Sequence, residues 1–76
     1  MDSKKILSAN LKQYRAKHKL SQEELAARAE LSTRGYGKIE RAEVHSSLET
    51  LDKLSRGTGL SQANLLSEQL EVELGS

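Results

Sequence analysis

The chain has 76 residues, no cysteine, proline, tryptophan or phenylalanine, and a formal net charge of only +1. This length allows one small domain, and two histidines without cysteine exclude a thiolate zinc site, so we expect no metal and no cofactor. No apolar stretch approaches the ~20 residues that span a bilayer, and the N-terminus lacks a signal-peptide core. We therefore expect a cytoplasmic protein with no membrane partner.

The charges are unevenly distributed along the chain. Residues 1–41 carry ten lysines and arginines against five acidic residues, a net charge of +5. Residues 42–76 carry two basic residues against six acidic ones, a net charge of −4. Such asymmetry is typical of a cationic binding face on an otherwise acidic protein, although the halves of a short chain also differ by chance.

Apolar spacing and serine caps predict the first three helices. Leu7, Leu11 and Tyr14 recur at i, i+4 and i+7, which predicts a helix over residues 4–17. Ser21 with Glu24 has the spacing of a capping box, which predicts that a second helix over 22–29 begins there. A third helix, over 33–40, is predicted to begin after a second serine cap at residue 32.

Two further helices follow the same pattern. Ser46 or Ser47 is expected to cap a helix over 48–57, with Gly57 and Gly59 at its end. Ser61 is expected to cap a short helix over 62–67. Only residues 70–74 alternate as a strand does, so the sequence predicts an all-α fold of five helices.

The second and third predicted helices are short and are separated by three residues, 30–32. Helix-turn-helix DNA-binding units are built in this way. The first helix crosses the phosphate backbone, and the N-terminal side chains of the second contact base edges in the major groove. Other pairs of helices that meet at a corner have similar spacing, so the spacing alone does not distinguish them.

Five separated motifs make the pattern more specific: Leu20-Ser21-Gln22-Glu23-Glu24-Leu25-Ala26, Leu31-Ser32, Ile39-Glu40-Arg41, Ser47-Leu48-Glu49-Thr50-Leu51 and Leu60-Ser61. In this order they resemble the lambda-repressor-like helix-turn-helix family, in particular the compact bacterial and phage regulators related to the Xre repressor. The resemblance covers about residues 5–66. It implies a five-helix DNA-binding domain over residues 1–66, followed by a C-terminal tail over 67–76.

The resemblance also implies roles for individual residues. The positions that match base-contacting residues are Thr33, Arg34 and Lys38, and those that match phosphate contacts are Gln22 and Arg41. Ser32 is also expected to contact a phosphate, and Lys17 and Lys19 are expected to add nonspecific attraction at the edge of the groove. A helix N-terminus attracts an anion at Gln22, and Arg34 can bind guanine O6 and N7 in bidentate fashion. The alternative is that Arg34 and Lys38 are only solvated surface charges.

Arg15 and Glu40 match a pair that forms a structural salt bridge between the first helix and the end of the third in this family. If that pair is buried, removal of one partner leaves the other charge uncompensated. Its expected role is to orient the third helix, with no part in catalysis. The alternative is that Arg15 contacts a phosphate.

The chain departs from the family at several positions, one of them the loop after Ala42, where His45 or Ser46 stands in place of the usual proline. Glu30 and Ala42 stand where the family usually has glycine, so a left-handed backbone there is strained. Gly35 and Gly37 lie inside the third helix, and each costs about 1 kcal/mol relative to alanine. They allow close approach to DNA, delay the ordering of the helix until it binds DNA, or mark weakened DNA binding.

The C-terminal tail is more apolar than a solvated segment needs to be. We expect a dimer surface made by Leu65, Leu66, Leu70, Val72 and Leu74, through either an extended fifth helix or strand pairing of residues 70–74. The alternative is a frayed terminus.

These features predict a sequence-specific DNA-binding transcriptional regulator, a repressor or autoregulator that binds a palindromic double-stranded operator as a homodimer. The alternative is a protein-interaction module of the same fold, such as an antitoxin that acts on a partner protein. We expect no enzyme, because there is no Cys–His pair and His18 and His45 lie at a helix end and in a loop. The sequence gives no sign of a small-molecule ligand.

Overall fold

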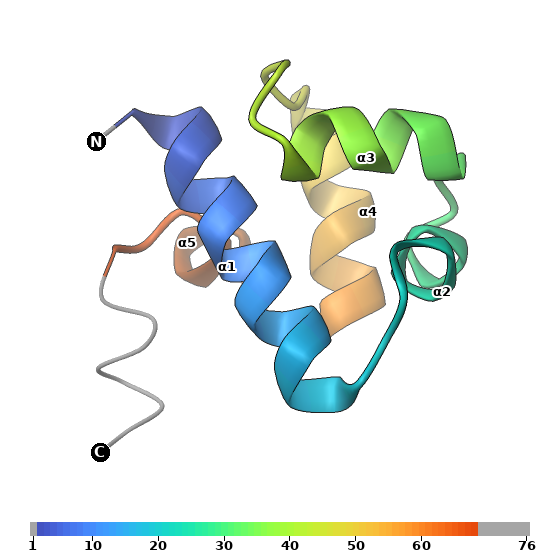
Figure 1. Cartoon of the computed structure of the whole chain (residues 1–76). Coiled ribbons are helices and arrows are strands. Elements are labelled where there is room, and N and C mark those ends of the chain that lie inside the picture. The colour runs from blue at the N-terminus through green and yellow to red at the C-terminus, as the bar shows by residue number, and fades with distance from the viewer. Residues whose placement is uncertain (1, 69–76) are drawn as a thin grey trace.

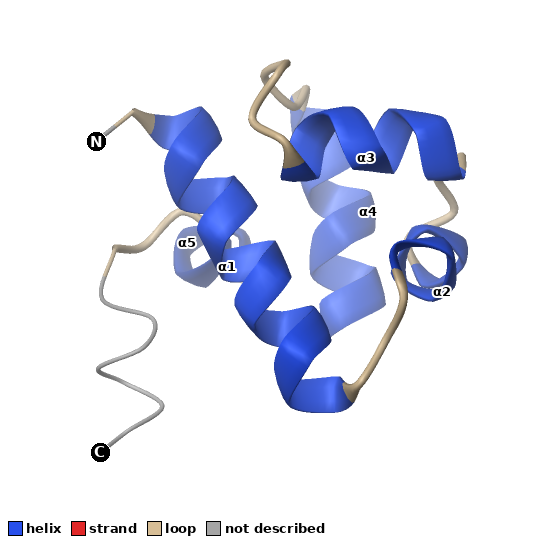
Figure 2. Ribbon diagram, viewed as in Figure 1, coloured by secondary structure: helices blue, strands red, loops and turns tan. Residues whose placement is uncertain are grey.

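The computed structural model describes residues 2–68, which form five α-helices and no strand (Figure 2). The helices are α1 (Ser3–His18), α2 (Gln22–Arg28), α3 (Thr33–Glu40), α4 (Leu48–Thr58) and α5 (Gln62–Leu65). The predicted all-α class is confirmed. The segment 70–74, which alternates as a strand does, lies outside the described residues.

Each helix begins at a side-chain cap. The capping residues accept a hydrogen bond from the backbone N–H three positions further along, and they are Asp2, Ser21, Ser32, Ser47 and Ser61. Glu24 completes the capping box at α2, since its carboxylate accepts from the backbone N–H of Ser21 at 2.9 Å. Of the two serines expected before α4, Ser47 is the one that caps it.

The end of α4 differs by one residue from the prediction. The helix continues to Thr58 and ends at Gly59, which adopts the left-handed φ of 77°. Gly57 therefore lies inside α4, where a Cβ atom would come within 3.0 Å of the Cα of Ala29. Its role is to let α4 pack closely against the end of α2.

The end of α5 also differs, because the helix stops at Leu65 and does not reach residue 67. The carbonyl groups at this end accept hydrogen bonds from the buried side-chain amide of Asn10 on α1. The distances are 2.7 Å to the carbonyl of Leu65 and 3.0 Å to that of Ser67. A side chain from another helix thus satisfies carbonyl groups at the end of α5.

The five helices enclose a small core made of leucine, isoleucine, alanine and one tyrosine. Its buried members are Leu7, Leu11, Leu25, Ala26, Ala29, Tyr36, Ile39, Leu51, Leu54 and Leu65. In Figure 1, α3 runs across the molecule and packs against α1 and α2, while α4 packs against α2 and α5. Among the described residues, no helix has the length and hydropathy needed to cross a membrane.

Candidate nucleic-acid interface

A tight turn joins α2 to α3. Glu30 lies in the left-handed region at a φ of 58°, and the backbone N–H of Leu31 donates to the carbonyl of Ala26 at 2.8 Å. The chain then changes direction, so that α2 is seen end-on in Figure 1 while α3 lies across the view. Glu30 thus adopts the conformation that the family usually gives to glycine, at a cost of roughly 1–2 kcal/mol. Ala42, after α3, does the same at a φ of 60°.

One face of α3 is buried and the opposite face is accessible. Tyr36, Ile39 and Glu40 point into the protein. Thr33 and Arg34 are exposed and Lys38 is half-buried, so the three expected base-contacting residues share the accessible face. An α-helix with one such face fits the major groove of B-DNA.

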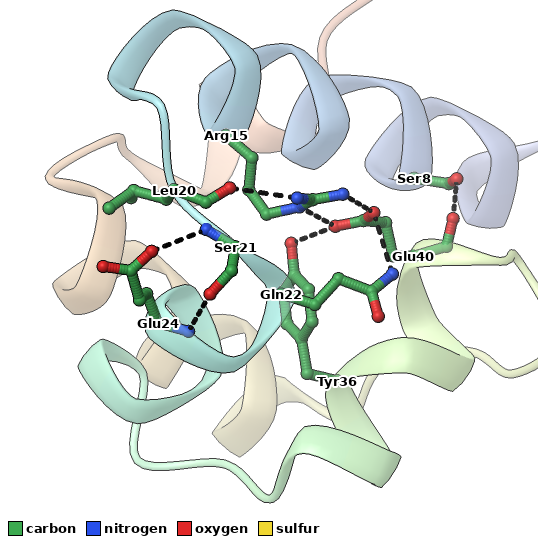
Figure 3. A network of polar contacts seen from close by, with 8 residues as sticks. All are labelled: Ser8, Arg15, Leu20, Ser21, Gln22, Glu24, Tyr36 and Glu40. Carbon is green, nitrogen blue, oxygen red and sulfur yellow. Dashed lines mark hydrogen bonds and ion pairs between the residues drawn. The ribbon is translucent and has the colours of Figure 1, made fainter.

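The C-terminal end of α3 is held by a polar network around Glu40 (Figure 3). The side chain of Glu40 is only 2% exposed. Arg15 of α1 donates to both carboxylate oxygens, from Nε at 2.7 Å and from Nη2 at 2.5 Å. Tyr36 donates its hydroxyl to Oε2, and Gln22 donates its amide to Oε1 at 3.1 Å. The carboxylate therefore ties α1, α2 and α3 together.

Two contacts extend the network to the backbone. Arg15 also donates from Nη1 to the carbonyl of Leu20 at 3.0 Å, which fixes the segment between α1 and α2. The hydroxyl of Ser8 donates to the backbone carbonyl of Glu40, where α3 ends. Arg15 is thus bound to the segment before α2 as well as to Glu40, and Glu40 is bound through both its side chain and its backbone.

The network shifts the pKa values of its members. Burial raises the pKa of Glu40, but the hydrogen bonds from Arg15, Tyr36 and Gln22 outweigh burial and hold this pKa below 4.5. Burial, followed by the hydrogen bond to the Glu40 carboxylate, raises the pKa of the Tyr36 hydroxyl far above 10.0. The hydrogen bond to Glu40 raises the pKa of Arg15. Glu40 is therefore ionised at neutral pH, while Tyr36 keeps its proton.

The residues expected to contact phosphates lie in three places. Gln22 is half-buried at the start of α2 and is bound to Glu40, and Ser32 is exposed at the start of α3. Lys17 and Lys19 are exposed at the end of α1. Arg41 follows α3, and its Nε lies 2.6 Å from Oε2 of Glu43.

The expected dimer surface needs one correction. Leu65 is fully buried in the core of its own chain, so its side chain is not accessible to a second copy. Leu66 is 38% exposed. The other three expected members, Leu70, Val72 and Leu74, lie outside the described residues. Two further apolar side chains, Val44 and Leu48, are exposed, and Leu48 is 79% exposed.

Sequence reasoning missed three polar residues that fix this arrangement. Tyr36 packs its ring into the core, and its hydroxyl also holds Glu40. Their i, i+4 spacing is the signal that could have revealed the contact. Ser8 and Asn10 act across 32 and 55 residues of sequence, and no local pattern announces such contacts. Among residues 2–68, no group of three or more His, Asp or Glu side chains could hold a metal ion.

Comparisons with known proteins agree with this geometry. The sequence profile of the family described as helix-turn-helix matches residues 11–63. The chain is 39% identical over 69 residues to the control protein C.SmaI of Serratia marcescens, covering 91% of this chain and 82% of that protein. The crystal structure of a hypothetical transcription factor, NHTF, from Neisseria superimposes with a TM-score of 0.84 at 27% identity, covering 96% of this chain and 85% of that one. The chain therefore belongs to the helix-turn-helix family of DNA-binding transcriptional regulators.

Proposed function

We propose that this protein is a sequence-specific repressor or autoregulator that inserts α3 into the major groove of its operator. Thr33, Arg34 and Lys38 contact base edges in this proposal. The observation that supports it best is the polar network around Glu40, which fixes the buried face of α3 and leaves the opposite face accessible. A helix whose end is tied to α1 and α2 presents its side chains in one orientation, which base discrimination requires.

The phosphate contacts in this proposal come from both ends of the helix-turn-helix unit. Gln22 uses one amide hydrogen for Glu40 and keeps the second for a phosphate oxygen. Ser32 lies beside the start of α3, and Lys17 and Lys19 add sequence-independent attraction. A phosphate bound by Gln22 is thereby coupled, through Glu40, to the position of α3.

The assembled form in this proposal is a homodimer on a palindromic operator, with half-sites about one helical turn apart. The proposed contact surface comprises Leu66 and the segment 70–74, so that residues 1–66 form the DNA-binding domain and 67–76 the extension. Sedimentation of the full chain and of a chain truncated after Ser67 tests the role of the tail. We expect the truncated chain to sediment as a monomer. An unchanged dimer would show that the tail does not form the dimer contact.

Selection of bound sequences from a pool of random duplexes tests the proposed function. We expect a preferred, two-fold symmetric site whose affinity falls steeply as salt is raised, because bound phosphates release counterions. An Arg34→Ala variant should lose about 1–3 kcal/mol of discrimination at one base pair of each half-site. The proposed DNA-binding function is contradicted if no duplex binds at low salt. A protein-interaction module would then account for the fold.

The relatives support the regulatory side of the proposal. The name of the Serratia marcescens relative describes a control protein, and that of the Neisseria structure describes a hypothetical transcription factor. Autoregulation is tested with a reporter gene placed under the promoter of the protein's own coding sequence, where the selected site is expected to occur. Reporter output should fall when the protein is supplied in trans, and a rise would show activation instead.

A further inference from the structure

The accessible face of α3 contains a glycine where a side chain is expected. Successive helical residues are about 100° apart, so positions 33, 34, 37, 38 and 41 share one face. Gly37 lies between Thr33 and Arg41 on this side of the helix, has no side chain and is itself buried. The guanidinium of Arg41 fills the space instead, since a Cβ atom at residue 37 would lie 2.8 Å from its Nη1 and 3.6 Å from its Cζ.

A second contact fixes the orientation of this guanidinium. Nε of Arg41 lies 2.6 Å from the carboxylate of Glu43, so the edge that carries Nε is occupied. No residue between 2 and 68 accepts a hydrogen bond from Nη1 or Nη2, and the side chain is 52% exposed. The Nη1–Nη2 edge thus has no acceptor among the described residues and lies over Gly37, beside the positions of Arg34 and Lys38 on the helix.

We propose that Arg41 is a specificity-determining residue, seated on Gly37 and oriented by Glu43 so that its Nη1–Nη2 edge contacts a guanine in the operator. Guanine O6 and N7 are the base-edge acceptors that an arginine fork matches. This assignment rests on the proposed DNA-binding function and moves Arg41 from the phosphate contacts to the base contacts. Phosphate contacts set the register of a protein on the duplex but carry no sequence information, so the two roles differ in whether base preference depends on Arg41.

Gly37→Ala tests the seat without removing any side chain that contacts DNA. The added methyl meets only the far end of a flexible side chain, so we expect the helix to form and Arg41 to be displaced. Arg41→Lys keeps the charge but removes the planar fork, so it separates charge from bidentate recognition. Circular dichroism checks that both variants remain helical.

The matched control is Arg56→Ala. Arg56 is also an exposed arginine paired with an acid, since its Nη2 lies 2.8 Å from Asp52, but it belongs to α4. This variant loses the same charge as Arg34→Ala, but away from the α3 face. It measures how much affinity changes through net charge alone.

The experiment measures dissociation constants for the selected operator and for each of its single base-pair variants. We expect Arg41→Lys and Gly37→Ala to lose discrimination at the same base pair, by roughly tenfold or more, and Arg34→Ala to lose it at a different one. Arg56→Ala should leave the preference at every position unchanged.

Two results overturn the inference while the proposed function stands. If Arg41→Lys weakens binding to the operator and to all its base-pair variants by the same factor, the base preference is unchanged and Arg41 contacts only phosphate. If Gly37→Ala keeps the full preference that Arg41→Lys loses, the seat on Gly37 has no role. If the wild-type chain selects no preferred sequence, the proposed function and this inference fail together.

Discussion

Replacing Glu40 with glutamine removes the charge at the centre of the polar network and keeps the shape of the side chain. All three side chains that bind this carboxylate, from Arg15, Gln22 and Tyr36, do so as donors. An amide offers them only one oxygen and turns its own N–H groups toward two of them. The guanidinium of Arg15, which is only 24% exposed, then loses its counter-charge.

The structure allows the loss to be estimated. Removing one partner of a buried ion pair costs about 3–5 kcal/mol, and we expect the lower end, about 3 kcal/mol, because Arg15 keeps some contact with water. A chain of this size has a free energy of unfolding of roughly 4–11 kcal/mol. Glu40→Gln should therefore remove a large part of the stability and lower the urea midpoint by about 2–3 M.

Equilibrium unfolding in urea, followed by circular dichroism at 222 nm as the usual helical signal, measures this loss. The matched control is Asp52→Asn, which breaks the exposed Asp52–Arg56 pair on α4 and should cost only about 0.5 kcal/mol. Combining Glu40→Gln with Arg15→Met should cost less than the sum of the two single losses, by roughly 1–3 kcal/mol. A loss below about 1 kcal/mol for Glu40→Gln, or strictly additive losses, would refute the view that this pair holds the fold.

Three further predictions concern the same helices. The folded-state pKa of Glu40 is lowered, so its contribution to stability is complete above about pH 4.5 and is lost as the pH falls through the lower folded value. Between about pH 5 and about pH 2 the melting temperature of the wild type should therefore fall further than that of Glu40→Gln, and parallel curves would contradict this. Tyr36→Phe removes one donor to a buried carboxylate and should cost about 1.5–3 kcal/mol in urea unfolding, whereas an unchanged midpoint would show that the hydroxyl is dispensable. Of the three glycines within α3 and α4, Gly57 and Gly37 should respond oppositely to alanine. Gly57→Ala, whose methyl would press on the backbone of Ala29, should destabilise by about 1–3 kcal/mol, and Gly37→Ala should stabilise by about 1 kcal/mol. Thermal melting of both variants measures this, and melting temperatures that shift in the same direction would contradict these packing environments.

The helices could be predicted because their signals are local. The serine caps at residues 21, 32 and 61, together with the apolar period, predicted the starts of α2, α3 and α5, and these starts are confirmed. A cap and the N–H that it accepts from are three residues apart, so a short window of sequence contains the whole interaction. The family resemblance placed Arg15 opposite Glu40, and the structure contains that ion pair.

The helix ends and the fine structure of the interface could not be predicted in the same way. Leu65 looked like a surface residue from its neighbours in sequence, yet it fills the core beneath α1 and α4. The position of Arg41 depends on the missing side chain of Gly37 and on Glu43, and only coordinates relate these three residues in space.

The sequence by itself determined the all-α class, the number of helices and the position of the helix-turn-helix unit, because capping and periodicity act within one or two turns. The tertiary structure decided which donors surround Glu40, where α5 ends and which side chains share the accessible face of α3. These features depend on contacts between residues that are far apart in the chain, such as Asn10 with Leu65 and Ser8 with Glu40. Such contacts form only when the helices pack, so no local pattern specifies them.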